Sequence, residues 1–276
     1  MGLPALTSPG GTADLGSDTD QARWLAADQA AMWEVASVVA VGRGAASTTL
    51  RLRLAEPPDV LPGQYYLVRL AIEAPPFVIE QAYSLCSSPY PPSAEIEIVV
   101  RPVPGGRAST TLARRVEPGD RLQMRGPFGF LTWTESDGGP VGLVGAGSGV
   151  APLASIVGYA AARHLEVPMT LLCSSRDRGT VLLGEQLREL NHRHDWLTVV
   201  HTFTRSPHDP SAAHHRRIDL DMLAEVMART KGRIGEGPFY VAGPADMVSS
   251  VRGALGDLGV PDAAIYSEDH AWTTGR

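Results

Sequence analysis

The chain has 276 residues, of which 43% are hydrophobic and 20% charged, so it can fill the cores of two domains and is not expected to be disordered. Its net charge of −6 argues against a nucleic-acid-binding protein, because such proteins are usually basic. Cys86 and Cys173 are its only cysteines, too few for an iron–sulfur cluster or a four-cysteine zinc site. We expect free thiols in a reducing cytoplasm and no metal site.

The first 32 residues predict a mobile N-terminal tail, with a composition at 21–33 that is compatible with a short helix. They contain no basic segment followed by an apolar run, so we expect no secretory signal. Residues 138–162 are uncharged for long enough to suggest a membrane span. Their many glycines, with Pro140 and Pro152, instead indicate a buried strand, turn and helix, so we expect no membrane association.

Residues 33–136 contain short β-like segments in which apolar and polar residues often alternate, separated by turns rich in Pro and Gly. This pattern predicts an antiparallel β-barrel domain, interrupted by one helix near 109–115. The expected strands are 33–41, 48–55, 64–72, 95–103 and 120–126, with a further strand end at 80–88.

From residue 137 to residue 276 the pattern changes, because apolar strands alternate with amphipathic helices. Such alternation predicts a doubly wound α/β domain, in which helices cover both faces of a parallel sheet. The polar loop 205–217 is expected to be exposed. The expected strands are 141–147, 169–175, 197–204, 238–243 and 263–269, and the expected helices are 151–165, 182–193, 220–230 and 245–259.

A glycine-rich turn, Gly147-Ser148-Gly149-Val150-Ala-Pro152, joins the first strand of the α/β domain to its first helix. Glycines let backbone N–H groups approach a ligand, and the start of a helix attracts anions. Proline is suited to the first helical turn, where its missing donor costs nothing. The turn therefore predicts a seat for the pyrophosphate of a dinucleotide.

Two other enzyme classes are disfavoured. A hydrolase nucleophile elbow would need glycines at the positions of Ala146 and Val150. A short-chain dehydrogenase would need a Tyr-x-x-x-Lys pair, but Tyr159 is followed four residues later by Arg163, and Lys231 has no tyrosine four residues before it.

The second strand of the α/β domain ends in Cys173-Ser174-Ser-Arg176, where the ribose of a bound adenosine would lie. An arginine at this place accommodates a 2′-phosphate, so Ser174 and Arg176, with Arg205, favour NADPH. Solvated loop arginines explain the same residues equally well. The choice between NADH and NADPH therefore stays open.

Four motifs together resemble the ferredoxin–NADP reductase superfamily, above all its flavin-binding oxidoreductases and oxygenase reductases. The resemblance extends from Trp33 to His270 and depends on the order of the motifs. They are Gln81-Ala-Tyr83-Ser84-Leu-Cys-Ser87 for the family's Arg-x-Tyr-Ser-x-x-Ser, Gly106-Arg-Ala-Ser109 for Gly-x-x-Ser, Gly147-Ser148-Gly149-Val150-Ala-Pro152, and Ala242-Gly243-Pro244 for Cys-Gly-Pro. Gln81 and Ala242 replace the arginine and the cysteine of the family.

The resemblance implies a site for FAD, with FMN the less expected flavin, and a site for NAD(P)H as co-substrate. It implies catalytic roles for Tyr83 against the isoalloxazine ring, for Ser84 near its N5 atom and for Glu268, which resembles a family glutamate. The implied flavin-binding residues are Gln81, Tyr83, Ser84, Ser87, Arg101, Gly106, Arg107, Ala108 and Ser109. The implied NAD(P)H-binding residues are Gly147, Ser148, Gly149, Val150, Pro152, Ser174, Arg176, Gly243 and Pro244.

Residues 99–125 are rich in arginine, against only two acidic residues, Glu117 and Asp120. Such a patch could steer an acidic ferredoxin, hold flavin phosphate, or be a solvated surface, and the sequence leaves these three interpretations open. The arginines are Arg101, Arg107, Arg114, Arg115, Arg121 and Arg125.

The expected function is a flavin-dependent NAD(P)H oxidoreductase that passes electrons to a separate acceptor: a ferredoxin, an oxygenase, a haem protein or a small molecule. The replacements at Gln81 and Ala242 motivate a first alternative, a flavin-poor or non-catalytic regulatory homologue. A second alternative is a pathway oxidoreductase that acts directly on an organic substrate.

Overall fold

The computed structural model describes residues 33–73, 76–228 and 236–269. The tail and the helix expected before Trp33 lie outside these residues. From Glu34 onward the described residues belong to one compact unit.

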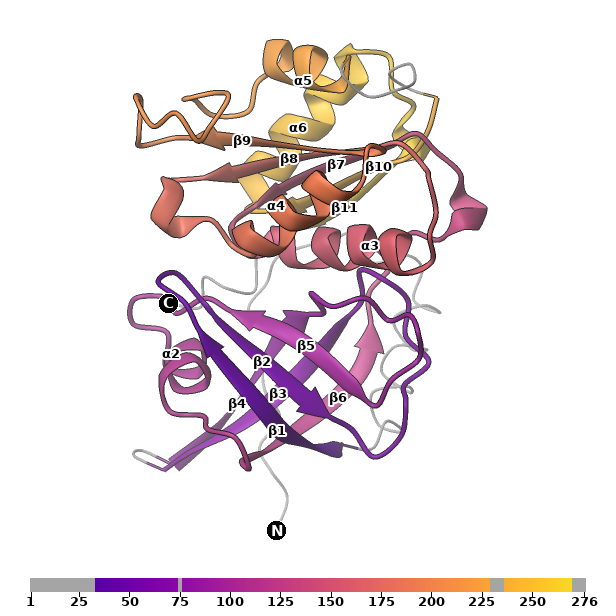
Figure 1. Ribbon diagram of the computed structural model, residues 1–276. Helices are drawn as coiled ribbons and strands as arrows, with labels where there is room; N and C mark the ends of the chain where they lie inside the picture. The colour runs from indigo at the N-terminus through magenta and orange to yellow at the C-terminus, as the bar shows by residue number, and fades with distance from the viewer. Residues whose placement is uncertain (1–32, 74–75, 229–235, 270–276) are drawn as a thin grey trace, which may run out of the picture. The chain divides into compact units, whose positions relative to one another are not determined.

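The first part of the chain forms an antiparallel six-stranded sheet (Figure 1), with the strand order β4-β3-β6-β1-β2-β5. An isolated antiparallel bridge between Leu85 and Ile98 joins the end of β4 to β5, so the sheet closes into the expected barrel. The strands are β1 (Glu34–Arg43), β2 (Thr48–Arg53), β3 (Tyr65–Glu73), β4 (Pro76–Ser84), β5 (Glu95–Val100) and β6 (Arg121–Phe128). β4 begins at Pro76, earlier than the strand end expected from residue 80.

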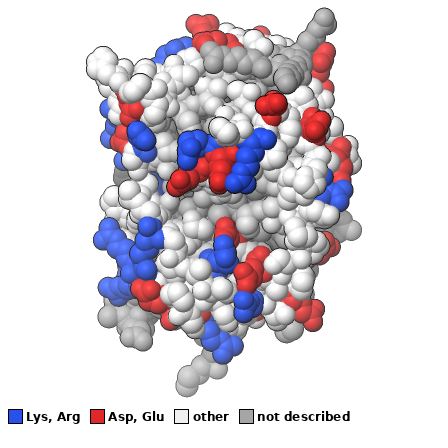
Figure 2. Space-filling model, viewed as in Figure 1, with Lys and Arg blue, Asp and Glu red and all other residues white. Residues whose placement is uncertain are grey.

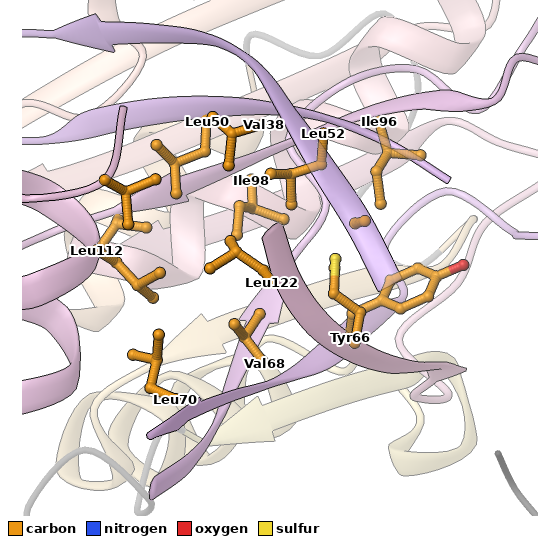
Figure 3. Close-up of a cluster of buried hydrophobic side chains, with 14 of the residues drawn as sticks. Val38, Leu50, Leu52, Tyr66, Val68, Leu70, Ile96, Ile98, Leu112 and Leu122 are labelled. Atoms are coloured by element: carbon orange, nitrogen blue, oxygen red, sulfur yellow. The ribbon is translucent and has the colours of Figure 1, made fainter. Parts of the chain in front are cut away.

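Alternation places one face of these strands in a common core, whose side chains are drawn in Figure 3. Helix α2 (Arg107–Arg114) adds Leu112 to the same core. This helix starts directly after Gly106, two residues earlier than the sequence indicated. The labelled core residues are Val38, Leu50, Leu52, Tyr66, Val68, Leu70, Ile96, Ile98, Leu112 and Leu122.

The second part forms a five-stranded parallel sheet with the order β11-β10-β7-β8-β9, which confirms the doubly wound prediction. Helices α3 and α4 pack on one face, and α5 and α6 pack on the other (Figure 1). The strands are β7 (Val141–Ala146), β8 (Met169–Ser175), β9 (Leu197–Phe203), β10 (Phe239–Gly243) and β11 (Ile265–Asp269). The helices are α3 (Val150–Ala162), α4 (Gly184–Arg193), α5 (Leu220–Met227) and α6 (Ala245–Asp257), with short 3-10 helices η1 (Glu135–Asp137), η2 (Gly147–Gly149), η3 (Arg178–Thr180) and η4 (Asp262–Ala264).

The loop 205–217 differs in part from the exposed loop that was expected. Most of it is exposed, but Ala213 and His214 donate backbone hydrogen bonds to the carbonyl of His201 in β9. His214 is only 6% exposed, so the end of this loop extends the edge of the parallel sheet.

The uncharged stretch 138–162 forms β7, the glycine turn and α3, as expected. Among the described helices, none combines the length and the apolar composition that crossing a bilayer requires.

Candidate functional site

The topology of the parallel sheet selects one place for a ligand. β7 lies in the middle of the sheet, with β8 on one side and β10 on the other. The connections after β7 and β10 therefore start on opposite sides of a switch point, where open α/β sheets bind their ligands. The expected NAD(P)H residues Gly147–Val150 follow β7, and Gly243 ends β10 with Pro244 directly after it, so the structure brings both sets together.

Gly149 allows these two connections to touch. A methyl group at this position would lie 2.1 Å from the carbonyl oxygen of Ala242, far inside van der Waals contact. Only glycine therefore fits here without displacing backbone. The side chain of Val150 is buried in the core beneath α3, and Pro152 lies in the first turn of that helix. These two residues shape the site. The N–H of Val150 donates to the carbonyl of Gly147, and the N–H groups before it stand at the start of the helix, where an anion is favoured.

Two arginines from different parts of the chain lie within electrostatic range of each other, and one of them lies at the glycine turn. Arg101, which the resemblance placed among the flavin-binding residues, follows β5 of the barrel and lies beside the nucleotide turn, since a methyl group on Gly147 would lie 3.0 Å from its Nη1 atom. Burial and, secondly, the positive charge of Arg176 lower the pKa of Arg101. Within the described part of the chain, neither arginine forms an ion pair with an acidic residue. Two guanidinium groups without a carboxylate partner favour a bound anion.

Ser174 and Arg176 stand at the carboxyl end of β8, as the sequence predicted for an adenosine ribose. Ser174 pairs with Ala146 at the end of β7 and is partly buried, whereas Arg176 is exposed. The N–H of Arg205 donates to the carbonyl of Arg176, which places the start of the loop 205–217 against the same edge.

The expected flavin strand is the end of β4. Tyr66 and Val68 of β3 lie opposite Tyr83 and Gln81, and both are fully buried in the barrel core. Residues that face each other across two strands point to the same side. Gln81 and Tyr83 therefore share the inward face, and Tyr83 packs against the edge of the core.

The hydroxyl of Tyr83 is buried and has no hydrogen-bond partner among the described residues. Burial raises the pKa of Tyr83, so the hydroxyl keeps its proton. A buried hydroxyl without a partner is unusual in a folded protein, and a bound ligand with an acceptor oxygen would satisfy it.

Glu268 reaches the flavin strand from the far end of the chain. It lies near the end of β11. Burial and, secondly, the negative charge of Glu268 raise the pKa of Tyr65 on β3. Tyr65 is the residue directly opposite Ser84. Glu268 is therefore within electrostatic range of Tyr65, although the two residues lie far apart in the sequence.

The carboxyl group of Glu268 is poised to titrate near neutral pH. Burial, and to a smaller extent the charge of Asp269, raises its pKa to about 7. At this value both protonation states are populated near pH 7, which suits a group that holds or releases a proton during a reaction.

The start of α2 is the expected phosphate-binding turn. The Oγ atom of Ser109 accepts a hydrogen bond from the N–H of Val103 at 3.1 Å and donates to the carbonyl of Gly106 at 3.4 Å, so it closes the turn. Ala108 is buried and Arg107 is exposed. No side chain caps the helix, so its first N–H groups point out of the turn as donors for an anion.

Ser87 has a different place from the rest of the flavin motif. Its Oγ atom accepts a hydrogen bond from the N–H of Glu97 in β5 at 3.0 Å. Its carbonyl accepts a second bond, at 2.7 Å, from the hydroxyl of Ser155 in α3. The hydroxyl and the carbonyl of Ser87 are thus both engaged in hydrogen bonds within the protein.

The six arginines between residues 99 and 125 do not form one patch. Arg125 is 8% exposed and lies over the ring of Phe128, at 5.7 Å from its centre. Arg114 and Arg115 are exposed at the end of α2, where Figure 2 shows arginine side chains gathered on the surface. The nearby Glu117 is paired with Arg43 at 2.8 Å.

Sequence reasoning missed two residues at this site, Tyr65 and Ser155. Tyr65 lies on a strand that was expected, but only the pairing of β3 with β4 places it opposite Ser84. Ser155 lies in an expected helix, and its contact with Ser87 depends on tertiary packing. Neither position carries a local sequence signal.

The described residues contain no group of His, Cys, Asp and Glu that could hold a metal ion. Their features fit a flavin and a dinucleotide instead. These features are the partnerless hydroxyl of Tyr83, the open helix start after Gly106, and the glycine turn with its two arginines. Cys86 and Cys173 are free and buried, and burial raises the pKa of both thiols.

Comparison with known proteins agrees with this geometry. Residues 35–133 match the oxidoreductase FAD-binding domain family, and residues 143–253 match the oxidoreductase NAD-binding domain family. The ferredoxin reductase component of a 3-ketosteroid-9-alpha-monooxygenase from Mycobacterium tuberculosis is 33% identical over 208 residues, which are 75% of this chain and 54% of that relative. The chain therefore spans about half the length of this relative.

Solved structures give the same fold. A cytochrome P450 reductase from Amycolatopsis is 26% identical, with a TM-score of 0.74 over 87% of this chain and 70% of that one. The flavohem-like FAD/NAD-binding domain of a nitric oxide dioxygenase from Vibrio cholerae has a TM-score of 0.75 at 22% identity, over 86% of this chain and 98% of that one. The chain belongs to the ferredoxin–NADP reductase superfamily, with an FAD-binding barrel followed by an NAD-binding α/β domain.

Proposed function

We propose that the protein is an NAD(P)H-dependent flavin oxidoreductase that passes electrons to a separate acceptor. The observation that carries this proposal is that the charge of Glu268 in the α/β domain acts on Tyr65 of the barrel, which lies opposite Ser84 in β4. Hydride transfer requires a nicotinamide and a flavin to face each other, and this is the place where the two halves offer residues to one site.

Bound FAD supplies the redox chemistry, since it can accept a hydride and release two electrons singly. The residues of the chain bind and orient. Tyr83 offers an apolar ring face and a hydroxyl, Gln81 a neutral amide, and the start of α2 its backbone N–H groups. Ser84 offers a hydroxyl beside Tyr65, and Glu268 holds or releases a proton there.

On the nicotinamide side, the glycine turn offers N–H groups to a pyrophosphate, and Arg101 offers a guanidinium beside them. Arg176 stands where a ribose 2′-phosphate would lie, so we propose a preference for NADPH over NADH. The ratio of kcat/KM for the two nucleotides measures this preference directly.

The separate acceptor is proposed from two similarities. The relative from Mycobacterium tuberculosis is named the ferredoxin reductase component of a monooxygenase, and the Amycolatopsis protein is named a cytochrome P450 reductase. Both names describe a reductase that serves another protein. We therefore propose a ferredoxin or an oxygenase component as the partner, with the boundaries 33–136 and 137–276 for the two domains. We also propose a cytoplasmic location, to which the free, buried cysteines are suited.

A spectroscopic experiment tests this function. The purified protein, incubated with FAD and freed of excess, should absorb near ~450 nm, and NADPH or NADH should bleach that band anaerobically. Oxygen-free addition of a one-electron acceptor should restore the band. If the protein binds no FAD, the regulatory homologue is supported instead. The observation that favours this alternative is the neutral Gln81 in place of the family's arginine. Bleaching that only an organic substrate reverses would support the pathway oxidoreductase.

A further inference from the structure

Helix α3 runs beside the segment that follows the flavin strand. Its small residues Ala151, Ser155 and Gly158 are spaced four and three apart, so they lie on one face of the helix. This face contacts the segment Cys86–Ser88. Ala151 shares a buried cluster with the first residue of the segment, and a methyl group on Gly158 would lie 3.6 Å from the last. We call this contact the α3 joint.

One buried hydrogen bond fixes the middle of the α3 joint. Ser155 is fully buried, and its hydroxyl donates to the carbonyl of Ser87 at 2.7 Å. The Oγ atom of Ser87 accepts from the N–H of Glu97, so the bond continues into β5 of the barrel. A partly buried carbonyl that loses such a donor loses its hydrogen bond within the protein, which favours a shift of the segment.

The flavin strand and the glycine turn are each close in sequence to one side of the α3 joint. Ser84 precedes Ser87 by three residues, and Gly149 precedes Ser155 by six. A shift of α3 along the segment would therefore move the glycine turn relative to the flavin strand. Reactions between two held groups depend steeply on such displacements, since about 1 Å can cost about a hundredfold in rate.

We propose that Ser155 is a positioning residue for hydride transfer, acting through Ser87 to hold the NAD(P)H-binding turn in register with the flavin strand. The proposal rests on the proposed function. It assigns to Ser87 the role of a joint between the two domains, in place of the flavin contact that its motif suggests.

The test compares three variants of the full chain. Ser155→Ala removes the hydroxyl, and Ser155→Cys replaces it with a weak donor of similar size. Thr202→Val is the matched control, because Thr202 is also fully buried and its hydroxyl donates to the carbonyl of Arg216 at 2.6 Å, away from the joint. Two readouts are used: amide hydrogen exchange of the FAD-free protein, and anaerobic stopped-flow reduction of bound FAD at saturating NADPH or NADH.

We expect Ser155→Ala to retain FAD and to be reduced about ten- to a hundredfold more slowly than wild type at saturating nucleotide. Exchange should accelerate in the segment 86–88 and at the start of α3. Ser155→Cys should lie between Ser155→Ala and wild type, and it carries the test if the alanine variant does not fold. Thr202→Val should match wild type in both readouts.

Suppose that the FAD bound to the wild-type protein is reduced, and that Ser155→Ala and Thr202→Val have equal limiting rates of FAD reduction. This result would overturn the role of Ser155 and leave the proposed function standing. Faster exchange at the joint without a change in rate would overturn it as well. If neither NADPH nor NADH reduces the FAD bound to the wild-type protein, the proposed function is overturned, and this inference with it.

Discussion

The two sides of the proposed site offer different groups to an anion. The flavin strand, from Gln81 to Ser84, carries no charged residue, and it offers an amide, an aromatic ring and hydroxyl groups. The nicotinamide side combines the glycine turn with the guanidinium groups of Arg101 and Arg176, which have no acidic partner in the described chain. Charge-assisted hydrogen bonds are roughly twice as strong as neutral ones. In the proposed site, a flavin would accordingly be held mainly by shape and backbone, and a nucleotide more by charge.

The largest effect is expected where shape alone decides, at Gly149. A methyl group there would lie 2.1 Å from the carbonyl oxygen of Ala242, so Gly149→Ala must displace the turn. We expect reduction of bound FAD by NAD(P)H to slow by about a hundredfold or more, with FAD content unchanged, since the flavin strand lies outside this contact. Stopped-flow reduction and the absorbance at ~450 nm measure the two quantities.

Gly253→Ala is the control for that variant, because a methyl group at Gly253 in α6 meets no atom within 4 Å. It should leave the rate unchanged. If Gly149→Ala is reduced as fast as the control, the close approach of the two connections is not required for nucleotide binding.

The pH dependence of stability should report Glu268, which lies where the two sides meet. Its pKa is raised from near 4.5 to about 7 in the folded protein, so folding favours the protonated carboxyl. The contribution is complete below about pH 4.5 and is lost as the pH rises through about 7, for a total of up to about 3 kcal/mol. Denaturant unfolding of wild type and Glu268→Gln measures it.

We expect the free energy of unfolding of wild type to fall relative to Glu268→Gln across this interval of pH. The glutamine variant is the control for the wild type, because its side chain has nearly the same shape and lacks the titrating carboxyl group. Parallel pH profiles for the two proteins would show that Glu268 is solvated and titrates normally.

The two arginines of the proposed nicotinamide side can be tested separately. Arg176→Gln should lower the kcat/KM ratio of NADPH to NADH by about ten- to a hundredfold, since only NADPH carries the 2′-phosphate. Arg101→Gln should instead raise the KM for both nucleotides alike, because it lies beside the glycine turn. Steady-state kinetics with an excess of a neutral quinone acceptor gives both parameters.

Arg188→Gln on α4 is the matched control for these variants, since its side chain is 73% exposed and lies outside the site. It should change neither the kcat/KM ratio of NADPH to NADH nor the KM for either nucleotide. An unchanged ratio in Arg176→Gln would identify Arg176 as a solvated loop residue.

The smallest effect is expected on the neutral side. Gln81→Arg adds a charge-assisted hydrogen bond beside the flavin phosphates, and it should tighten FAD binding by about tenfold. Titration of the FAD-free protein gives the dissociation constant. Gln81→Leu should not tighten it, and an unchanged constant in Gln81→Arg would show that another group already binds the phosphate.

The sequence predicted the elements that depend on local pattern. The antiparallel barrel, the parallel sheet and the glycine turn follow from alternation, from strand–helix order and from residue types with one conformational use. It did not predict that β4 begins at Pro76, nor that the loop 205–217 returns to the sheet edge at His214. Both depend on a partner strand that lies elsewhere in the chain.

The sequence by itself determined the two domain types and the order of the motifs, because glycine, proline and alternating apolar residues act within a few positions of one another. Only the tertiary structure decided which side chains share a site. It set Arg101 beside Gly147, Glu268 within electrostatic range of Tyr65, and Ser87 against Ser155. These contacts join segments that are far apart in the chain, and they arise from strand pairing and helix packing, which leave no local trace in the sequence.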